Sequence, residues 1–529
     1  MAELFLIQCQ QREFKKLAKQ TNSSKISPVF VISIVATLVL SLCAALGGDA
    51  FSAFSNALMN GIEGGFGWMY LLAMLAFVVF ALCVALRRWG DIRLGERDSR
   101  PEYSTPAWLA MLFCAGMGIG LVFWGVAEPI SHYLAPPESI EAASPEAANF
   151  AMEASFMHWG FQPWAAYAVI GLGLAYAHFR KGRPFLVSSL LIPALGKADK
   201  PGVRNAIDIF AAIVTVAGVA TSLGLGCLQI SAGLESLFGI KNEALTWVVI
   251  IVVICIVYSL SAISGVNKGV KRLSSLNAIF ALVFAATCFV LGPTLLDLNI
   301  FTTTLGSYLQ GFLKSSLDAF PFGDNTWLLS WRIFYWAWWI AWSPFVGMFI
   351  ARISKGRTVR EFVLGVVIAP SLLSMAWFAI FGGMGLSFAV DAPVEYLSGL
   401  VSVPENALFA VLGSFPLGDF LSIFALVIII IFFITSADSA TYVLGVMSSS
   451  GNETPSSSMK LIWGVAQALV ALALLIAGGI KALQTFSIAA AFPFIFIMAL
   501  ACTGMIKEFW HERSETKRAT SPNELGSDS

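Results

Sequence analysis

Charged residues are scarce in this chain of 529 residues. Lys, Arg, Asp and Glu together make up 12% of it, 57% is hydrophobic, and the mean hydropathy is +0.79. Soluble domains carry about 25% charged residues, so this composition excludes an ordinary soluble protein. The 32 basic and 32 acidic side chains give a net charge of zero, which predicts no nucleic-acid partner.

Signals for disulfides, metals and catalysis are weak as well. The eight cysteines show no CxxC pairing, and seven lie in apolar runs as small buried side chains would. The four histidines (His132, His158, His178 and His511) are scattered without ligand spacing. Neither an HExxH motif nor a pair of catalytic carboxylates occurs inside an apolar run. These absences predict no resident cofactor or metal centre and no enzymatic activity.

Long apolar runs are what the chain has in abundance. Each is a candidate transmembrane helix, and the chain is long enough to hold many of them. The twelve runs cover 28–47, 66–86, 106–127, 155–177, 206–232, 244–263, 274–296, 327–351, 362–389, 419–447, 460–479 and 484–506. The sequence therefore predicts an all-α integral membrane protein with twelve transmembrane helices.

The distribution of basic residues predicts the orientation. Lys and Arg cluster before the first run and in every second loop after it, whereas the loop 128–157 carries five Glu and no Lys or Arg. Under the positive-inside rule both termini are cytoplasmic, and an even number of spans agrees. The first 27 residues are polar and basic and lack a cleavage site, so we expect no cleavable signal peptide. We expect a multi-pass protein of the plasma (inner) membrane.

Two of the runs contain residues that interrupt helices. The third run places Gly116, Gly118 and Gly120 at alternate positions, and the eighth has Ser343-Pro344 at its middle. In lipid, unwound backbone is tolerated only where it lines a cavity. The third and eighth spans are five apart and each opens a group of five, which predicts LeuT-type inverted five-helix repeats with two discontinuous helices.

This organisation divides the chain into six parts. We expect a cytoplasmic tail over 1–27, two peripheral helices with a basic loop over 28–105, a first repeat over 106–300, an amphipathic interfacial helix and loop over 301–326, a second repeat over 327–507 and a short cytoplasmic tail, disordered in character, over 508–529.

The eighth run also holds four tryptophans within seven residues, Trp336, Trp338, Trp339 and Trp342. Bulky packing is one interpretation of this cluster. A wall of indoles is also suited to a cation that donates no hydrogen bonds, such as a quaternary ammonium.

Polar residues in two other runs indicate an ion site. The tenth run contains Thr435, Ser436 and Asp438, and the fifth contains Thr215, Thr221 and Ser222. Hydroxyls in membrane helices commonly bond back to their own backbone. Hydroxyl and carbonyl oxygens are also hard ligands suited to a small cation, so sodium is the candidate coupling ion.

Three of these segments resemble the betaine/carnitine/choline transporter (BCCT) family. They are WAWWIAWSPFVGMFIARISKGRTVR from Trp336 to Arg360, GMGIG from Gly116 to Gly120, and TSADS from Thr435 to Ser439. The resemblance covers roughly 28–507, and the tryptophan segment is its most specific part. It implies a secondary transporter that works as a homotrimer.

The resemblance implies a substrate site. An aromatic box for the trimethylammonium head would be formed by Trp159, Trp164, Tyr167 and Trp339, and the cytoplasmic exit path would be lined by Trp338, Trp342 and Phe349. The substrate carboxylate would meet backbone N–H groups of the stretch that contains Gly116, Met117, Gly118 and Gly120.

The resemblance also implies where sodium binds. One site would take carbonyls near Cys114, Met117 and Phe432 and the hydroxyls of Thr435 and Ser436. A second site in the family's betaine carriers uses two threonines and a Phe. Here Thr215 and Phe345 match, but Val219 replaces the second threonine, and Ser222, about one turn on, is the substitute donor.

The sequence thus predicts sodium-coupled uptake of an onium compatible solute, with glycine betaine first. The corresponding region of the seventh run, Ser275 to Ala278, lacks the arginine of the family's sodium-independent exchangers. Alternatives are a proton-coupled carrier of choline, carnitine or dimethylsulfoniopropionate, which Val219 favours, and a sensor that binds substrate without transporting it. A membrane-embedded enzyme would need the catalytic motifs that are absent.

Overall fold

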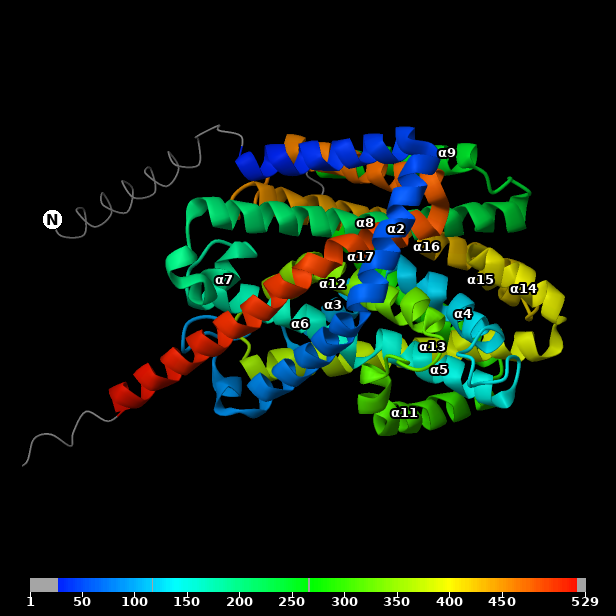
Figure 1. The fold of residues 1–529 in the computed structure, drawn as a ribbon, viewed down its shortest axis with the longest axis horizontal. Helices are drawn as coiled ribbons and strands as arrows, with labels where there is room; N and C mark the ends of the chain where they lie inside the picture. Colours follow the sequence, from blue (N-terminus) through cyan, green and yellow to red (C-terminus); the bar gives the residue numbers. More distant parts are fainter. Residues whose placement is uncertain (1–26, 117, 265–266, 521–529) are drawn as a thin grey trace, which may run out of the picture.

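The computed structural model describes residues 27–116, 118–264 and 267–520, without the side chains of residues 49, 113–116, 262–275 and 515–520. This part of the chain is helical and contains no β-strand, only an isolated bridge between Arg93 and Thr358. Many of the helices run roughly along the long axis of the molecule (Figure 1).

The helices of the first half are separated by short connections. They are α2 (Pro28–Leu86), η1 (Arg88–Asp91), α3 (Thr105–Gly116), α4 (Ile119–Leu134), α5 (Pro145–Trp159), α6 (Phe161–Ala175), η2 (Tyr176–Arg180), α7 (Ser188–Leu195), η3 (Gly196–Ala198), α8 (Pro201–Phe238) and α9 (Ala244–Ser264).

The second half begins with a sharply bent pair of helices, α10 and α11, and ends with a long kinked one, α17. Its elements are α10 (Asn267–Leu291), α11 (Thr294–Leu317), η4 (Leu328–Ile333), α12 (Phe334–Arg352), α13 (Val359–Asp391), α14 (Val394–Ser402), η5 (Pro404–Asn406), α15 (Ala407–Gly413), α16 (Gly418–Ser448) and α17 (Ser457–Thr520).

The all-helical prediction is confirmed. Eight of the described helical segments are long and apolar enough to cross a membrane, and ten if each of two bent pairs forms one span. Two long helices are kinked where glycine leaves the helical conformation: α2 at Gly48 (φ +48°), and α17 at Gly478 and at Gly479 (φ +59°). Glycine tolerates such positive φ values because it has no Cβ.

The prediction that the eighth span is broken at Ser343-Pro344 is wrong. α12 continues through both residues. Proline has no N–H to donate to the carbonyl of Ile340, four residues earlier. The Ser343 hydroxyl donates to that carbonyl instead, at 2.7 Å, so no acceptor is left unpaired.

The predicted acidic loop 128–157 is also largely wrong. α4 extends to Leu134 and α5 begins at Pro145, so helix replaces most of the expected loop. The fourth span was expected over 155–177, but the helix starts ten residues earlier and is interrupted at Gly160. Glu128 is therefore a fully buried residue of α4.

The amphipathic stretch 301–318 is helical, as expected, but it belongs to a longer helix. α11 starts at Thr294 and is bent by 110° from the end of α10, at Gly292 and Pro293. The bend ends the seventh span at Leu291, before the predicted residue 296.

The prediction of a disordered tail from residue 508 is wrong over its first part. α17 continues to Thr520, and residues 521–529 lie outside the described part of the chain. Acidic side chains of this last part pair with bases that follow α6. Glu512 pairs with Arg180 and, at 3.3 Å, with Lys181, and Glu508 pairs with Arg183 at 2.6 Å.

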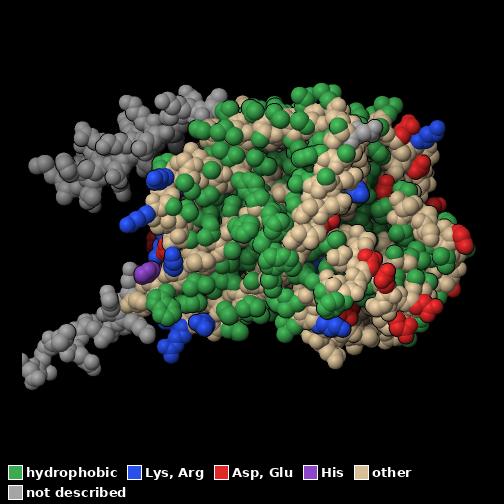
Figure 2. All heavy atoms as spheres, in the orientation of Figure 1, with side chains coloured by type: hydrophobic (Ala, Val, Ile, Leu, Met, Phe, Trp, Pro, Cys, Tyr) green, Lys and Arg blue, Asp and Glu red, His purple; other side chains and the backbone are tan. Residues whose placement is uncertain are grey.

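Charges are segregated along the long axis. Figure 2 shows a broad hydrophobic belt, with Lys and Arg gathered mostly at one end of the molecule and Asp and Glu mostly at the other. The basic end is the end near α7 and the last turns of α17 (Figure 1).

α12 lies at the centre of the bundle. It is apolar on all sides, as a helix buried in a core must be, and it packs against α6, α8 and α17. Its tryptophans therefore face protein from several directions.

Candidate functional site

The predicted third span is interrupted beside these tryptophans. α3 ends at Gly116 and α4 begins at Ile119, with Gly118 in an extended conformation (φ −136°, ψ −173°) between them. The predicted discontinuity of this span is confirmed. Met117 lies outside the described residues, and so does the side chain of Cys114.

Gly120 allows α4 to approach the tryptophans closely. A Cβ on this residue would lie 2.5 Å from Cη2 of Trp338 and 3.2 Å from Cη2 of Trp159. A Cβ on Gly118 would have its nearest neighbour, Trp342, at an ordinary 3.8 Å. Close packing therefore requires glycine at position 120 and not at position 118.

A second interruption follows Trp159. Gly160 has non-helical angles (φ −88°, ψ −133°), so α5 ends and α6 begins around it. The N–H of Phe161 donates to the hydroxyl of Tyr308 at 3.0 Å, and this hydroxyl donates to the side-chain carbonyl of Gln162 at 3.1 Å. α11 thus holds the break that separates Trp159 from the aromatic residues of α6.

The four predicted box residues are brought together from α5, α6 and α12. The ring centroids of Trp159 and Trp339 are 4.8 Å apart, those of Tyr167 and Trp339 are 6.3 Å apart, and those of Trp164 and Tyr167 are 5.5 Å apart. The interplanar angles are 71°, 84° and 88°, so neighbouring rings face different directions. Such an arrangement suits a compact cation surrounded by ring faces.

The indole N–H groups of two box members are already used. Trp159 donates to Oε2 of Glu128 at 2.9 Å, and Trp339 donates to the carbonyl of His158 at 2.8 Å. These bonds fix the planes of the two rings. The assignment of the box to substrate remains a prediction.

The residues predicted for the exit path continue from the box along α12. Trp338 stacks on Trp339 with centroids 4.7 Å apart, and Trp342 lies edge-on to Trp338 at 6.5 Å. Trp342 donates to the carbonyl of Gly218 in α8 at 2.7 Å. Phe349 is half-buried near the end of α12.

The residues predicted for the first sodium site lie partly within the described structure. Phe432, Thr435 and Ser436 belong to α16, where Phe432 and Thr435 are buried and Ser436 is half-buried. The Thr435 hydroxyl donates to the carbonyl of Ile431 at 2.9 Å. Its oxygen lone pairs stay available to a cation, because a hydroxyl has one hydrogen and two acceptor positions.

The second predicted sodium site has few oxygen atoms that could bind a cation. Thr215 donates to the carbonyl of Ala211 at 2.8 Å, and Ser222 lies 3.5 Å from the carbonyl of Gly218. Val219 is buried between them on α8, and the ring of Phe345 lies 5.4 Å from that of Trp342.

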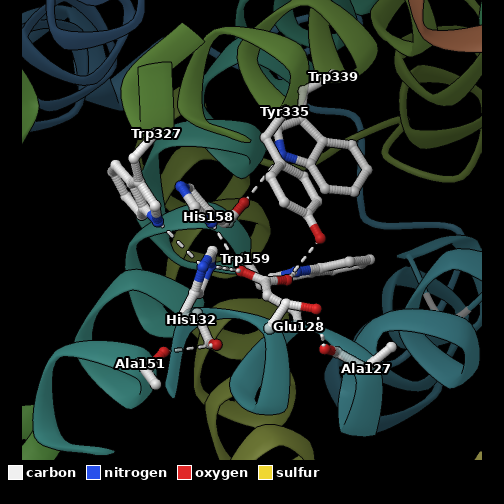
Figure 3. A network of polar contacts seen from close by, with 11 residues as sticks. Ala127, Glu128, His132, Ala151, His158, Trp159, Trp327, Tyr335 and Trp339 are labelled. Carbon is white, nitrogen blue, oxygen red and sulfur yellow. Dashed lines mark hydrogen bonds and ion pairs between the residues drawn. The ribbon is translucent and has the colours of Figure 1, made fainter. Parts of the chain in front are cut away.

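A polar cluster that the sequence reasoning missed adjoins the box. Figure 3 shows His132, His158, Trp159 and Tyr335 converging on Glu128. Oε1 of Glu128 lies 2.7 Å from Nδ1 of His158 and 3.4 Å from Nε2 of His132. Oε2 accepts from Tyr335 at 2.5 Å as well as from Trp159. The prediction that the histidines are scattered is therefore wrong for this pair.

Two signals in the sequence pointed to this cluster. Glu128 and His132 are four residues apart and so share a helix face. An acidic residue at the end of an apolar run, followed by more helix, is a candidate functional group. The prediction of a loop from residue 128 onward concealed both signals.

Ligand atoms of Glu128, His132 and His158 lie within 4.8 Å of one another, a spacing that a metal ion could use. The hydrogen positions disfavour this use. The Trp327 indole donates to Nδ1 of His132 at 3.1 Å, and an indole N–H can only donate. Nε2 of His132 therefore carries the hydrogen and offers no lone pair, so the cluster is a hydrogen-bond network centred on a carboxylate.

Comparisons with known proteins give matches along nearly the whole chain. Residues 28–514 match the model of the betaine/carnitine/choline family transporters. The chain is 45% identical over 498 residues to the glycine betaine transporter OpuD of Bacillus subtilis. The aligned region covers 93% of this chain and 96% of OpuD.

Two further relatives have similar coverage. The ectoine/hydroxyectoine transporter of Virgibacillus pantothenticus is 42% identical, over 90% of this chain and 94% of its own length. Glycine betaine transporter 1 of Vibrio parahaemolyticus is 39% identical, over 92% and 94%. A match along nearly the whole chain, together with the many apolar helices, means that this protein is a membrane transporter rather than an enzyme and belongs to the betaine/carnitine/choline transporter (BCCT) family.

Proposed function

We propose that this chain imports an onium compatible solute, with glycine betaine as the first candidate, by sodium symport with alternating access. The observation that carries the proposal is the group of four buried rings, Trp159, Trp164, Tyr167 and Trp339, beside the interruption between α3 and α4. The ring faces would hold the onium head, and N–H groups at the interruption would meet the substrate carboxylate.

The named activities of the relatives support this substrate class. Two of the relatives described above are glycine betaine transporters, and one transports ectoine and hydroxyectoine. Ectoine therefore belongs in any substrate panel with the trimethylated compounds. Choline, carnitine and dimethylsulfoniopropionate offer the same kind of methylated head to the box.

The architecture that we propose has twelve spans. Eight helical segments are each long and apolar enough to be a span, with α17 counted as one. A ninth span results when α17 is divided at Gly478 and Gly479. The remaining three are α3 together with α4, α5 together with α6, and α10. The spans form LeuT-type inverted repeats over 106–300 and 327–507 within a homotrimer. The basic end of the molecule (Figure 2) then faces the cytoplasm, with both termini, in the plasma membrane.

We propose one sodium ion per transport cycle, held by oxygens of Thr435 and Ser436 and by carbonyls near Cys114, Met117 and Phe432. At the second position, Val219 offers only methyl groups, and a buried cation with too few oxygens is strongly disfavoured. We expect uptake to depend on sodium with a Hill coefficient near one. Thr435→Ala with Ser436→Ala should remove the dependence, while a coefficient near two would show that the second site binds sodium.

A panel of uptake experiments in proteoliposomes tests the proposal. Glycine betaine, choline, carnitine, dimethylsulfoniopropionate and ectoine are supplied with and without a sodium gradient, and with and without a proton gradient. Sodium-dependent betaine uptake is the expected result. Choline uptake driven by protons alone would favour the alternative that Val219 supports, and binding without uptake would identify a sensor.

A further inference from the structure

A carboxylate lies at the edge of the aromatic box. Oε2 of Glu128 accepts the indole N–H of Trp159, and the Glu128 side chain is completely buried. Figure 3 shows this carboxylate between the two histidines on one side and the Trp159 and Tyr335 side chains on the other. Glu128 has four hydrogen-bond partners, and Trp159 is only one of them. The cluster is therefore larger than would be needed to orient one indole.

The hydrogen-bond partners favour the ionised form of Glu128. Trp159 is an obligate donor to Oε2, and the tautomer of His132 makes its Nε2 a donor to Oε1. Tyr335 and Nδ1 of His158 can both donate as well. A carboxylate with four donors around two oxygens is stabilised in its charged form.

The carboxylate of Glu128 is connected to two side chains that form walls of the box. One wall is Trp159 itself. The other is Trp339, whose indole donates to the carbonyl of His158 and whose ring lies 5.8 Å from that of Tyr335 at an interplanar angle of 27°. Glu128 holds both His158 and Tyr335, so it is linked to the second wall through two residues.

No Lys or Arg pairs with Glu128 in the part of the chain that the structure describes. The basic side chain near this cluster is Arg332, which lies over the ring of Trp327 at 5.1 Å and donates to the carbonyl of Ser315. Trp327 and His132 lie between that stacking contact and Glu128. No lysine or arginine among the described residues therefore neutralises this carboxylate, and its basic neighbours are the two histidines.

We propose that Glu128 is a specificity-determining residue, whose charge makes the box select a cationic head over an uncharged head of the same shape. The inference rests on the proposed onium function. A buried negative charge attracts a nearby cation strongly, because the surroundings screen it less than water does. The hydrogen bond from Trp159 to the carboxylate also increases the electron density of the indole face, which strengthens its attraction for a cation.

A pair of ligands separates charge from shape. Glycine betaine and 3,3-dimethylbutanoate differ in having nitrogen or carbon at the centre of the methylated head. Competition against radiolabelled glycine betaine gives the affinity of each, and their ratio measures selection for charge. If choline is the better substrate, 3,3-dimethylbutan-1-ol is its uncharged counterpart.

Glu128→Gln is the principal variant, and the site has room for it. The amide oxygen can accept from Trp159 and Tyr335, and the amide nitrogen can donate to Nδ1 of His158 once the ring proton is on Nε2. The variant loses the hydrogen bond from Nε2 of His132, which at 3.4 Å is the longest of the four. We expect the ratio to fall about tenfold, which corresponds to about 1.4 kcal/mol. Glu128→Asp keeps the charge but moves it away from Trp159, so it should lower the ratio about threefold. This variant takes the place of Glu128→Gln if Glu128→Gln does not fold.

The matched control is Glu405→Gln. Glu405 is also buried, at 6% exposure, but its side chain accepts from Asn242, away from the box. This variant should leave the ratio unchanged.

The outcomes separate the inference from the function on which it rests. If the wild-type protein binds none of the onium compounds, the proposed function fails. If it binds them and the ratio is the same in the Glu128 variant, or if both ligands weaken equally, Glu128 only supports the fold and the inference is overturned.

Discussion

Trp339 contacts two other residues of the box, Trp159 and Tyr167, and it stacks on Trp338. We expect Trp339→Leu to fold and insert but to bind substrate about 30-fold more weakly, because loss of one desolvated cation–π face costs roughly 2 kcal/mol. Trp339→Phe keeps a ring face and should recover part of the affinity. Equal apparent affinities of Trp339→Leu and wild type in uptake assays would refute the box.

Two glycines of one motif have different importance. Gly120→Ala places a methyl group 2.5 Å from Trp338, so either α4 or the tryptophan must move. We expect uptake by Gly120→Ala to fall about fivefold or more, since overpacking of this kind typically costs about 1–3 kcal/mol. Gly118→Ala is the control for packing: its methyl group has room, so its thermal stability should match the wild type, and a loss of uptake would report on contact with the substrate. Wild-type uptake by Gly120→Ala would show that the unwound stretch is arranged differently.

At the scale of the helix, α12 shows how a proline can sit inside a span. The Ser343 hydroxyl takes the place of the missing N–H at the carbonyl of Ile340. We expect Ser343→Ala to lower the free energy of unfolding by about 1–2 kcal/mol, because it leaves a buried acceptor unpaired. Adding Pro344→Ala restores a backbone donor and should recover most of the loss. Unfolding in detergent measures this double-mutant cycle, and additive losses would argue against the compensation.

The helical elements differ in how well local sequence determined them. Alternating glycines predicted the interruption between α3 and α4 correctly, because they remove side chains that stabilise a helix. Ser343-Pro344 predicted a break incorrectly, since a neighbouring hydroxyl repaired the hydrogen bond. The interruption at Gly160 had only a single glycine as its signal, and its support comes from Tyr308, which is distant in sequence.

At the scale of the whole molecule, ion pairs join the end of α17 to η2, which follows α6. Glu512 is 8% exposed and Arg180 14% exposed, and Tyr176 donates to Glu512 at 2.7 Å. We expect Glu512→Gln to lower the free energy of unfolding by about 1–3 kcal/mol, because it leaves a largely buried arginine without its partner. Arg513→Gln is the control, since its pair with Asp91 is long, at 3.9 Å, and exposed.

The same ion pairs define how much of the tail is dispensable. Deletion of 515–529 keeps Glu508 and Glu512, so uptake and any osmotic response should stay near wild-type levels. Deletion from 508 removes both acids and should destabilise the protein in thermal unfolding. A large loss of osmotic activation in the shorter deletion would mean that the last residues regulate transport.

Composition and periodicity alone determined that this is an all-helical membrane protein, because lipid leaves a chain of such long apolar runs little choice but to satisfy its backbone within helices. The local motifs were enough for the family, since those motifs are short and specific. Local motifs could not predict that Glu128 contacts His132, His158 and Tyr335. Glu128 and Tyr335 are separated by 207 positions, and no local propensity encodes their contact. That contact depends on how α4, α5 and α12 pack, because a buried carboxylate is stable only where the fold brings it enough hydrogen-bond donors.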